Sequence, residues 1–160
     1  MPMNHPMRRK DRAISQEECF QILQAGEYCV LASVDSEGMP YATPLSYVFM
    51  NGKVYFHAAQ EGHKLDNLRA APRCSLAVIG KTQPVYAKNF TTYYESVVIF
   101  GRVEEIYNPT DKTQILTALA NKYLPEHMDK AAKDIAASLD RTAVCAVHIE
   151  KMTGKAKRKQ

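Results

Sequence analysis

The sequence predicts a mainly β fold, a small antiparallel barrel with a few helices at its periphery. Five or six short runs of β-branched and aromatic residues follow one another, and turn residues such as Asn51-Gly52 separate them. Only one short helical pattern interrupts the early strands, whereas a parallel sheet needs a helix after almost every strand. A chain of 160 residues, 46% hydrophobic and 24% charged, is most simply one globular domain.

The first helix is predicted to begin at Ser15 and to end at Gly26. Ser15 and Glu18 have the spacing of a capping box, in which each side chain hydrogen-bonds the backbone N–H of the other residue. Apolar residues then recur at helical spacing up to the glycine. Residues 28–35 form the expected next strand, and a turn at 36–38 ends it.

A hairpin and a short helix follow. Two strand-like runs, residues 41–50 and 53–58, flank Asn51-Gly52, and this pair suits a tight turn in which both residues need positive φ. Residues 63–69 then show a short helical pattern, which Pro72 closes.

The second half contains the longest predicted strand and a helical pair. Residues 93–107 carry apolar residues on both faces, as in a barrel wall that a helix or a second subunit covers, and Gly101 indicates a bulge. Residues 80–92 are polar and contain Pro84, so we expect a loop with room for a short extended piece. The other expected elements are a strand at 74–79, a helix that starts at Asn108 and breaks at Pro125, a helix at 129–139 and a closing strand at 142–149.

Basic residues gather at the two ends of the chain, whose formal net charge is +4. We expect residues 1–13 to form an N-terminal arm, residues 14–152 the folded domain, and residues 153–160 a basic, solvated tail. Basic ends can bind nucleic acid, but no aromatic residue interleaves the C-terminal run, so this is the weaker interpretation.

The cysteines and the hydropathy pattern favour a cytoplasmic protein. The four cysteines include no C-x-x-C pair, which is typical of free thiols in a reducing compartment. No apolar run approaches the length of a membrane span, and the N-terminus lacks the apolar core of a secretory signal.

Residues 62–64 are a candidate phosphate site. Gly62 lets the backbone approach a ligand closely, the first N–H groups of the expected helix point outward, and Lys64 adds a positive charge. The alternative is a hairpin that leads into a surface helix with a solvated lysine, because G-x-K at such a junction is a weak pattern by itself.

In their order and spacing, several segments of the chain resemble the pyridoxamine-5′-phosphate-oxidase-like superfamily of FMN-binding split β-barrels. Within it the resemblance is closest to the 5-nitroimidazole-resistance branch of Nim-type flavin reductases. The segments that carry it are MRRKDR (7–12), TPLSY (43–47), FHA (56–58), EGHKLD (61–66) and YESVVIFG (94–101).

The resemblance implies an antiparallel barrel of Greek-key type that binds FMN between the subunits of a homodimer. Lys64 and His63 would meet the phosphate, and a partner's residues around Tyr93 to Ser96, with Tyr94 and Ser96 among the implied contacts, would close the site. The other implied cofactor-binding residues are Ala42, Thr43, Pro44, Leu45, Ser46, Phe56, His57, Ala58, Ala59 and Gly62.

The implied function is FMN-dependent reduction of small aromatic or nitro compounds, 5-nitroimidazoles among them. A flavin supplies its own hydride chemistry, so no side-chain nucleophile is required. His63 is the candidate catalytic residue, as a proton donor to a bound substrate, although a solvent-facing histidine at a helix start fits equally well. True pyridoxamine-phosphate oxidase activity is not expected, because the chain has no tryptophan and no C-terminal arginine cluster.

Two other classes stay open. The same barrel could carry flavin or haem without catalysis, as a sensor or a store, and the basic ends could make the protein a nucleic-acid-associated one. A metal site is not expected, because no two histidines stand three or four residues apart on one helix and no cysteine joins them.

Overall fold

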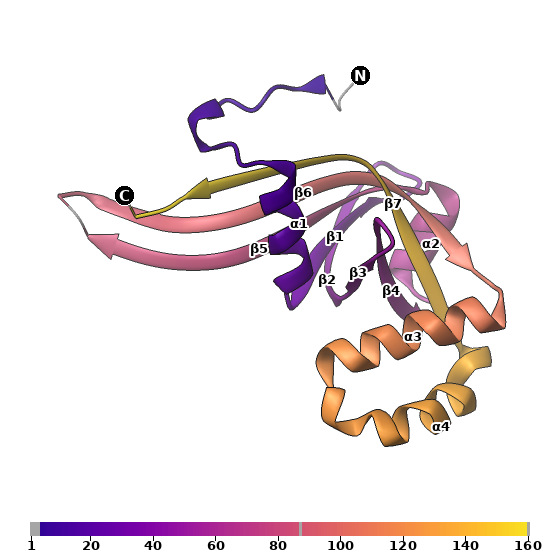
Figure 1. Ribbon diagram of the computed structural model, residues 1–160. Coiled ribbons are helices and arrows are strands. Elements are labelled where there is room, and N and C mark those ends of the chain that lie inside the picture. Colours follow the sequence, from indigo (N-terminus) through magenta and orange to yellow (C-terminus); the bar gives the residue numbers. More distant parts are fainter. Residues whose placement is uncertain (1–3, 87, 160) are drawn as a thin grey trace.

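Seven strands form one antiparallel sheet in the order β2-β1-β5-β6-β7-β4-β3, with helices at its periphery (Figure 1). This computed structural model describes residues 4–86 and 88–159. The helices are η2 (Lys10–Arg12), α1 (Gln16–Ala25), α2 (His63–Ala70), α3 (Pro109–Tyr123), η3 (Pro125–His127), α4 (Met128–Ser138) and η4 (Leu139–Arg141). The strands are β1 (Tyr28–Val34), β2 (Pro40–Ser46), β3 (Val48–Met50), β4 (Lys53–Ala59), β5 (Arg73–Tyr86), β6 (Phe90–Ile106) and β7 (Thr142–Lys157).

The sheet is curled into a barrel that is split between its first and last strands. β2 and β3 stand at opposite ends of the strand order, yet only Tyr47 separates them in the sequence. The sheet must therefore bend round until these two strands meet at Tyr47. Within the described chain, β2 pairs with β1 alone and β3 pairs with β4 alone, so the hydrogen-bonded ladder stays open. The predicted mainly β split barrel with peripheral helices is confirmed.

The predicted hairpin is confirmed at its turn but not along its first strand. Asn51 and Gly52 both have positive φ, 52° and 72°, as the turn type requires. Residues 41–50, expected to form one strand, are divided at Tyr47 into β2 and β3, because the two halves pair with opposite ends of the sheet.

The helix starts follow their predicted caps. The Ser15 side chain accepts from the backbone N–H of Glu18, and the carboxylate of Glu18 accepts from that of Ser15, which completes the capping box. The Asn108 side chain accepts from the N–H of Asp111 at 3.1 Å, and Pro109 is the first residue of α3. Each cap satisfies donors that a helix start leaves without a partner.

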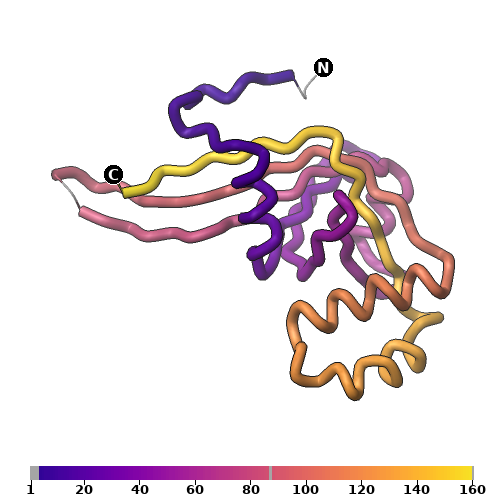
Figure 2. Tube along the Cα trace, in the orientation of Figure 1, coloured from indigo at the N-terminus to yellow at the C-terminus, as the bar shows by residue number. Residues whose placement is uncertain are grey.

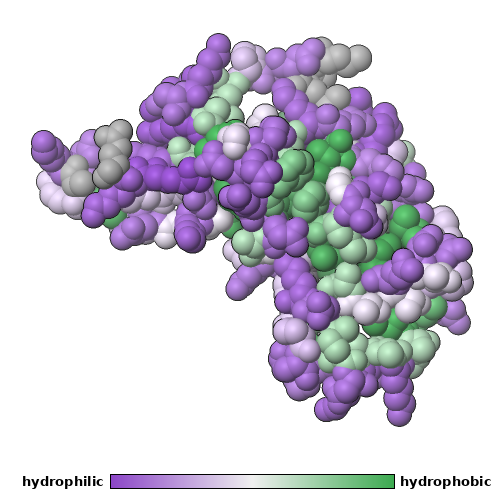
Figure 3. Space-filling view, viewed as in Figure 1, coloured by the Kyte–Doolittle hydropathy of each residue, from purple (hydrophilic) through white to green (hydrophobic). Residues whose placement is uncertain are grey.

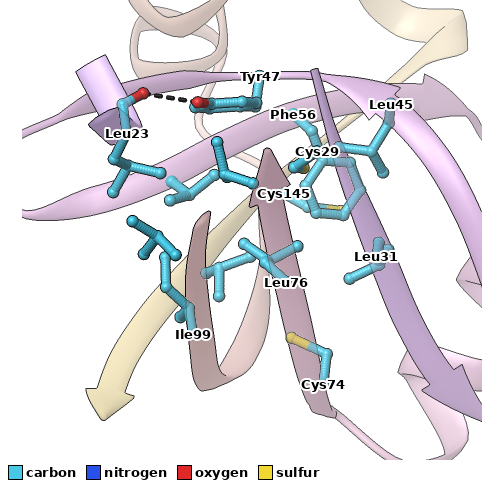
Figure 4. Close-up of a cluster of buried hydrophobic side chains, with 14 of the residues drawn as sticks. Leu23, Cys29, Leu31, Leu45, Tyr47, Phe56, Cys74, Leu76, Ile99 and Cys145 are labelled. Atoms are coloured by element: carbon cyan, nitrogen blue, oxygen red, sulfur yellow. Dashed lines mark hydrogen bonds between the residues drawn. The ribbon is translucent and has the colours of Figure 1, made fainter. Parts of the chain in front are cut away.

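Two hydrophobic clusters lie on opposite faces of the curled sheet. The larger fills the barrel and includes residues from α1 and α2 (Figure 4). The smaller packs α3 and α4 against residues of β3, β4 and β7. Val54 and Phe56 belong to the first cluster and Tyr55 to the second, which is the alternation expected of a strand buried on both faces.

Tyr47 holds the point where the barrel closes. Its side chain is fully buried, and its hydroxyl donates to the carbonyl of Leu23 in α1 at 2.6 Å (Figure 4). The Tyr123 hydroxyl accepts from the Tyr47 N–H at 3.0 Å, and Lys122 Nζ donates to the Tyr47 carbonyl at 2.8 Å. Burial raises the pKa of Tyr47, so the phenol stays protonated and keeps donating. Residues of α3 thus hydrogen-bond the backbone groups of Tyr47 at the break between β2 and β3, and Leu23 of α1 accepts from its hydroxyl.

Residues 80–92 were expected to form a loop, and this expectation is wrong. β5 continues to Tyr86 and β6 begins at Phe90, so most of the segment is a hairpin in which Pro84 pairs with Thr92. β1 pairs with β5 only between residues 75 and 78, which leaves the far part of β5 at the sheet edge. An edge position tolerates proline, because its missing N–H faces away from the ladder.

The solvated C-terminal tail is also wrong as far as Lys157. Residues 154–157 belong to β7, which pairs with β6 as far as Tyr94. Met152, Gly154 and Ala156 are buried while the lysines alternate with them, so the strand pattern was hidden within a basic run. Gln160 lies outside the described residues.

Beyond the barrel, β5, β6 and β7 continue together as a three-stranded extension (Figure 2). We call this extension, residues 79–86, 90–96 and 155–157, the arm, as distinct from the N-terminal segment. The register between β6 and β7 shifts between Phe100 and Gly101, which confirms the predicted bulge. A Cβ on Gly101 would collide with the His148 carbonyl, so a larger residue would not fit here without a shift of the backbone.

The thiols and the helices add two general properties. All four cysteines are free and buried, and burial raises the pKa of Cys29, Cys74 and Cys145 to about 12, so these thiols are protonated at neutral pH. Among the described residues, no helix has the length and apolar character that crossing a membrane requires.

Removing the Tyr47 hydroxyl tests its role at the closure point. We expect Tyr47→Phe to lower the free energy of unfolding by about 1–2 kcal/mol, because the buried Leu23 carbonyl loses its donor. The measurement is urea unfolding followed by circular dichroism. Tyr28→Phe is the matched control, since Tyr28 is 53% exposed, and it should change stability by no more than about 0.5 kcal/mol. Equal effects of the two substitutions would contradict this role.

Candidate functional site

The split in the barrel exposes two unpaired strand edges, which we call the seam: β2 and residues 56–59 of β4. β2 has a partner only on its β1 side. β7 pairs with β4 as far as Ala59, but β3 pairs with it only as far as Tyr55, so residues 56–59 lack a strand partner on one side. Among the described residues, the exposed part of these edges, which excludes the fully buried Phe56, therefore has backbone groups without a ladder partner that a ligand could reach.

The two edges run antiparallel along the seam. At one end the rings of Tyr41 and His63 contact each other in a tilted arrangement, with their centroids 4.0 Å apart, which joins the start of β2 to the start of α2. At the other end Ser46 and His57 line one pocket. The seam thus extends from the start of α2 to the closure point at Tyr47.

The predicted cofactor-binding residues of the two strands divide between the inner and outer faces. In β2, Leu45 is buried in the barrel core and Thr43 is half-buried on the same side, while the alternate residues are exposed. In β4, Phe56 is fully buried and Ala58 packs against the core. The outward-facing members are Ala42, Pro44, Ser46, His57 and Ala59.

The start of α2 has the properties of an anion site. Gly62 is the N-cap with φ 145°, a conformation that favours glycine, and no side chain caps the helix. A Cβ on Gly62 would meet nothing within 4 Å, so space is open beside the free N–H groups. Lys64 stands half-buried in the first turn, and Asp66 also lies in that turn. A free helix start beside an ammonium group is an arrangement that suits an anion.

The packing of α2 fixes this helix start. Leu65 and Leu68 are buried in the barrel core, and Asn67 Nδ2 donates to the Ser33 hydroxyl of β1 at 3.1 Å. Arg69 forms an ion pair with Glu105 of β6, with 2.5 Å between the guanidinium nitrogen and the carboxylate oxygen. The helix is therefore held at both ends of its buried face.

His57 is a neutral group at the end of the seam that adjoins the pocket. Part of its ring faces solvent, yet packing against its neighbours lowers its pKa, and the positive charge of Lys64 lowers it further. At neutral pH the imidazole therefore carries no charge and can both donate and accept one hydrogen bond.

A pocket of about 420 Å³ adjoins the seam beneath α3 and α4. Its walls are Ser46, His57, Leu116, Leu119, Ala120, Tyr123, Asp134, Ile135, Ser138 and Thr142. The apolar stripe of α3 can be read from the sequence. The pocket, however, exists only because α3 and α4 pack over two strands that are distant from them in the sequence. Sequence reasoning therefore missed Asp134 and Ser138.

Tyr94 and Ser96 do not join the seam within one chain. Both are half-buried in the arm, where Ser96 pairs with Ile79 of β5 and Tyr94 pairs with Lys157 of β7. The guanidinium of Arg12 donates to the Tyr94 hydroxyl at 3.4 Å, so the N-terminal segment contacts the arm here.

Metal-binding side chains do not gather within the described chain. No group of three or more His, Cys, Asp or Glu residues there could hold an ion. The seam itself offers backbone groups, Lys64, His57 and His63.

Known proteins share both the sequence pattern and the fold. The family model described as pyridoxamine 5′-phosphate oxidase matches residues 15–156. A search of the curated proteins finds no match.

Three solved structures share the fold. A protein described as a 5-nitroimidazole antibiotic resistance protein from Bacteroides thetaiotaomicron has a TM-score of 0.76 at 23% identity, over 90% of this chain and 86% of that one. The flavocytochrome Anf3 from Azotobacter vinelandii has a TM-score of 0.84 at 23% identity, over 99% of this chain and 75% of that one. The FAD and heme binding protein from Mycobacterium smegmatis has a TM-score of 0.78 at 21% identity, over 91% of this chain and 72% of that one.

At these identities the structural likeness establishes the fold alone. The superfamily resemblance of the sequence is confirmed, and a nitroimidazole-resistance protein stands among the structural neighbours. Because the family model extends from the first helix to the end of the last strand, this chain belongs to the pyridoxamine 5′-phosphate oxidase family of split-barrel proteins.

Proposed function

We propose that the seam binds FMN and that the protein uses it to reduce small aromatic or nitro compounds. The observation that carries this proposal is the uncapped start of α2, with Gly62 and Lys64, at one end of two unpaired strand edges. A phosphorylated planar cofactor matches this arrangement, because one end needs an anion site and the rest needs backbone hydrogen bonds.

The residues of the seam have distinct tasks in this proposal. The N–H groups of the first turn of α2 and the ammonium of Lys64 hold the phosphate. The free edges of β2 and β4 hydrogen-bond the polar rim of the ring system. The exposed side chains of Pro44 and Ala59 are small or rigid, so the ring can lie close to the backbone.

Flavin chemistry accounts for a site without a nucleophile. A bound flavin supplies hydride transfer, with a reduced nicotinamide as the proposed electron source. Reducing a nitro group to a nitroso group takes two electrons and two protons and releases water. His63, next to Tyr41 at one end of the seam, and the neutral His57 are the side chains that can deliver protons there.

The proposal includes a homodimer. Large apolar side chains are exposed on the arm, and they include Phe90 at 91% and Tyr86 at 72% exposed. A second copy that packs against the arm would cover such rings. The same contact would bring a partner's arm, with its Tyr94 and Ser96, to the seam as the superfamily resemblance implies.

Replacing Lys64 tests the phosphate site. We expect Lys64→Ala to weaken FMN binding by about ten- to a hundredfold, because one charge-assisted hydrogen bond to the phosphate is lost. The measurement is titration of the flavin-free protein with FMN, followed by quenching of flavin fluorescence.

Lys130→Ala is the matched control, because Lys130 is an exposed lysine of α4 that belongs neither to the seam nor to the lining of the adjoining pocket. Riboflavin, which lacks the phosphate, is the second control and should bind both variants equally. An unchanged FMN affinity in Lys64→Ala would remove Lys64 from the site.

Turnover separates a reductase from a flavin or haem binder. We expect the FMN-loaded protein with a reduced nicotinamide, under anaerobic conditions, to consume a 5-nitroimidazole at least about tenfold faster than the same concentration of free FMN. The measurement is the loss of nitro-group absorbance.

If the nicotinamide is oxidised but the nitro compound is not consumed, the protein is a flavin-dependent reductase that acts on another electron acceptor. If the flavin stays bound and no acceptor is reduced, the non-catalytic binder replaces the reductase. A Soret band on the purified protein would point to haem in that role.

A further inference from the structure

We propose that the pocket beneath α3 and α4, the α3–α4 pocket, is the substrate pocket of the seam and selects neutral or cationic aromatic compounds over anionic ones. This inference rests on the proposed function, because it names the class of compound that the bound flavin would reduce. The proposal rests on three polar groups that line an otherwise mainly apolar pocket: the carboxylate of Asp134, the neutral imidazole of His57 and the hydroxyl of Ser46.

The pocket has the size and composition of a ligand site. Its volume of about 420 Å³ accommodates a single substituted aromatic ring. Leu116, Leu119 and Tyr123 of α3 and Ile135 of α4 supply apolar walls. Figure 3 shows hydrophobic surface between these two helices, with hydrophilic surface around it.

The pocket opens on the same strands as the proposed cofactor site. Ser46 and His57 belong to the outer faces of β2 and β4 and also line the pocket. A ring that lies along the free strand edges would therefore meet a ligand in the pocket directly. The helices of the pocket also exclude water from one side of that contact.

Three polar side chains that line the pocket have no hydrogen-bond partner among the described residues. Among the described residues, none forms a hydrogen bond with the carboxylate of Asp134, the imidazole of His57 or the hydroxyl of Ser46. By contrast, the hydroxyls of Ser138 and Thr142 already donate to backbone carbonyls within 3 Å. Asp134, His57 and Ser46 can therefore hydrogen-bond and orient a ligand, as the few polar groups of a binding pocket do.

The charges around the pocket favour a cation. Asp134 is the only Asp, Glu, Lys or Arg among the lining residues. The nearby lysines of α3 point their ammonium groups elsewhere, since Lys112 donates to the Leu139 carbonyl at 2.7 Å and Lys122 to the Gly26 carbonyl at 2.6 Å. Lys64 influences His57 from the far end of the seam, where a bound phosphate would neutralise it. Lys130 and Lys133 are close to Asp134 on α4, but neither of them lines the pocket. Within the pocket itself an anionic compound would therefore meet a carboxylate and no cationic side chain.

Three compounds that differ mainly in charge test this selectivity. The probes are 4-nitrobenzylamine, a cation at neutral pH, the neutral 4-nitrobenzyl alcohol and the anion 4-nitrobenzoate. Their dissociation constants are measured calorimetrically with the FMN-loaded protein and separately with the flavin-free protein. We expect the amine and the alcohol to bind more tightly than the benzoate.

Asp134→Asn isolates the charge. We expect it to reduce the preference for the amine over the benzoate by about threefold, a modest change because the carboxylate is exposed. Asp129→Asn, an exposed aspartate of the same helix outside the pocket, should leave the preference unchanged. A benzoate that binds as tightly as the amine in the unsubstituted protein would overturn the proposal.

Filling the pocket with a larger side chain tests whether the probes bind in it. We expect Ser138→Phe to weaken binding of all three probes by about tenfold or more while FMN binding persists. Ala136→Phe is the matched control, since Ala136 is exposed on the same helix and outside the pocket. Ala120→Leu is the second pocket-filling variant, used if circular dichroism shows that Ser138→Phe is unfolded.

Unchanged probe affinity in a folded, filled variant would overturn the pocket assignment even where FMN is bound. If the protein never takes up FMN but the flavin-free chain binds the probes with the expected preference, the pocket stands and the reductase falls. The two proposals can therefore fail separately.

Discussion

The backbone at Tyr47 is the constraint on which the rest of the structure depends. It joins two strands that occupy opposite ends of the sheet, so the sheet has to curl into a barrel. The break leaves one peptide N–H and one carbonyl without a ladder partner, and residues of α3 satisfy both. The phenol is anchored in turn to the Leu23 carbonyl of α1. Helices α1 and α3, which are far apart in the sequence, thus meet at the residue that closes the barrel.

The same constraint creates the candidate site. A closed barrel would pair every strand, whereas this one leaves β2 and the end of β4 with free edges. Free edges are a liability in most proteins because they recruit other strands. In this family member they run from an uncapped helix start at Gly62 to a pocket between α3 and α4. A ligand with a phosphate at one end and a flat polar ring at the other would satisfy what the fold leaves open.

Local signals in the sequence predicted the parts of this arrangement that depend on neighbouring residues. The Asn51-Gly52 turn, the caps of α1 and α3 and the bulge at Gly101 each follow from a few adjacent positions. The division of residues 41–50 at Tyr47 could not be predicted, because it depends on which distant strands each half pairs with. The arm was missed because Pro84 and alternating lysines conceal period-two patterns at an edge. Asp134 joined the pocket only through packing, and no spacing in the sequence reports that.

The central claim is that the split between β2 and β4 holds a flavin. The most direct measurement is the visible absorption spectrum of the freshly purified protein, with the chromophore then released by heat and identified by mass spectrometry. We expect a flavin spectrum and released FMN. A colourless protein that also fails to take up added FMN would contradict it, and the seam would then need another ligand.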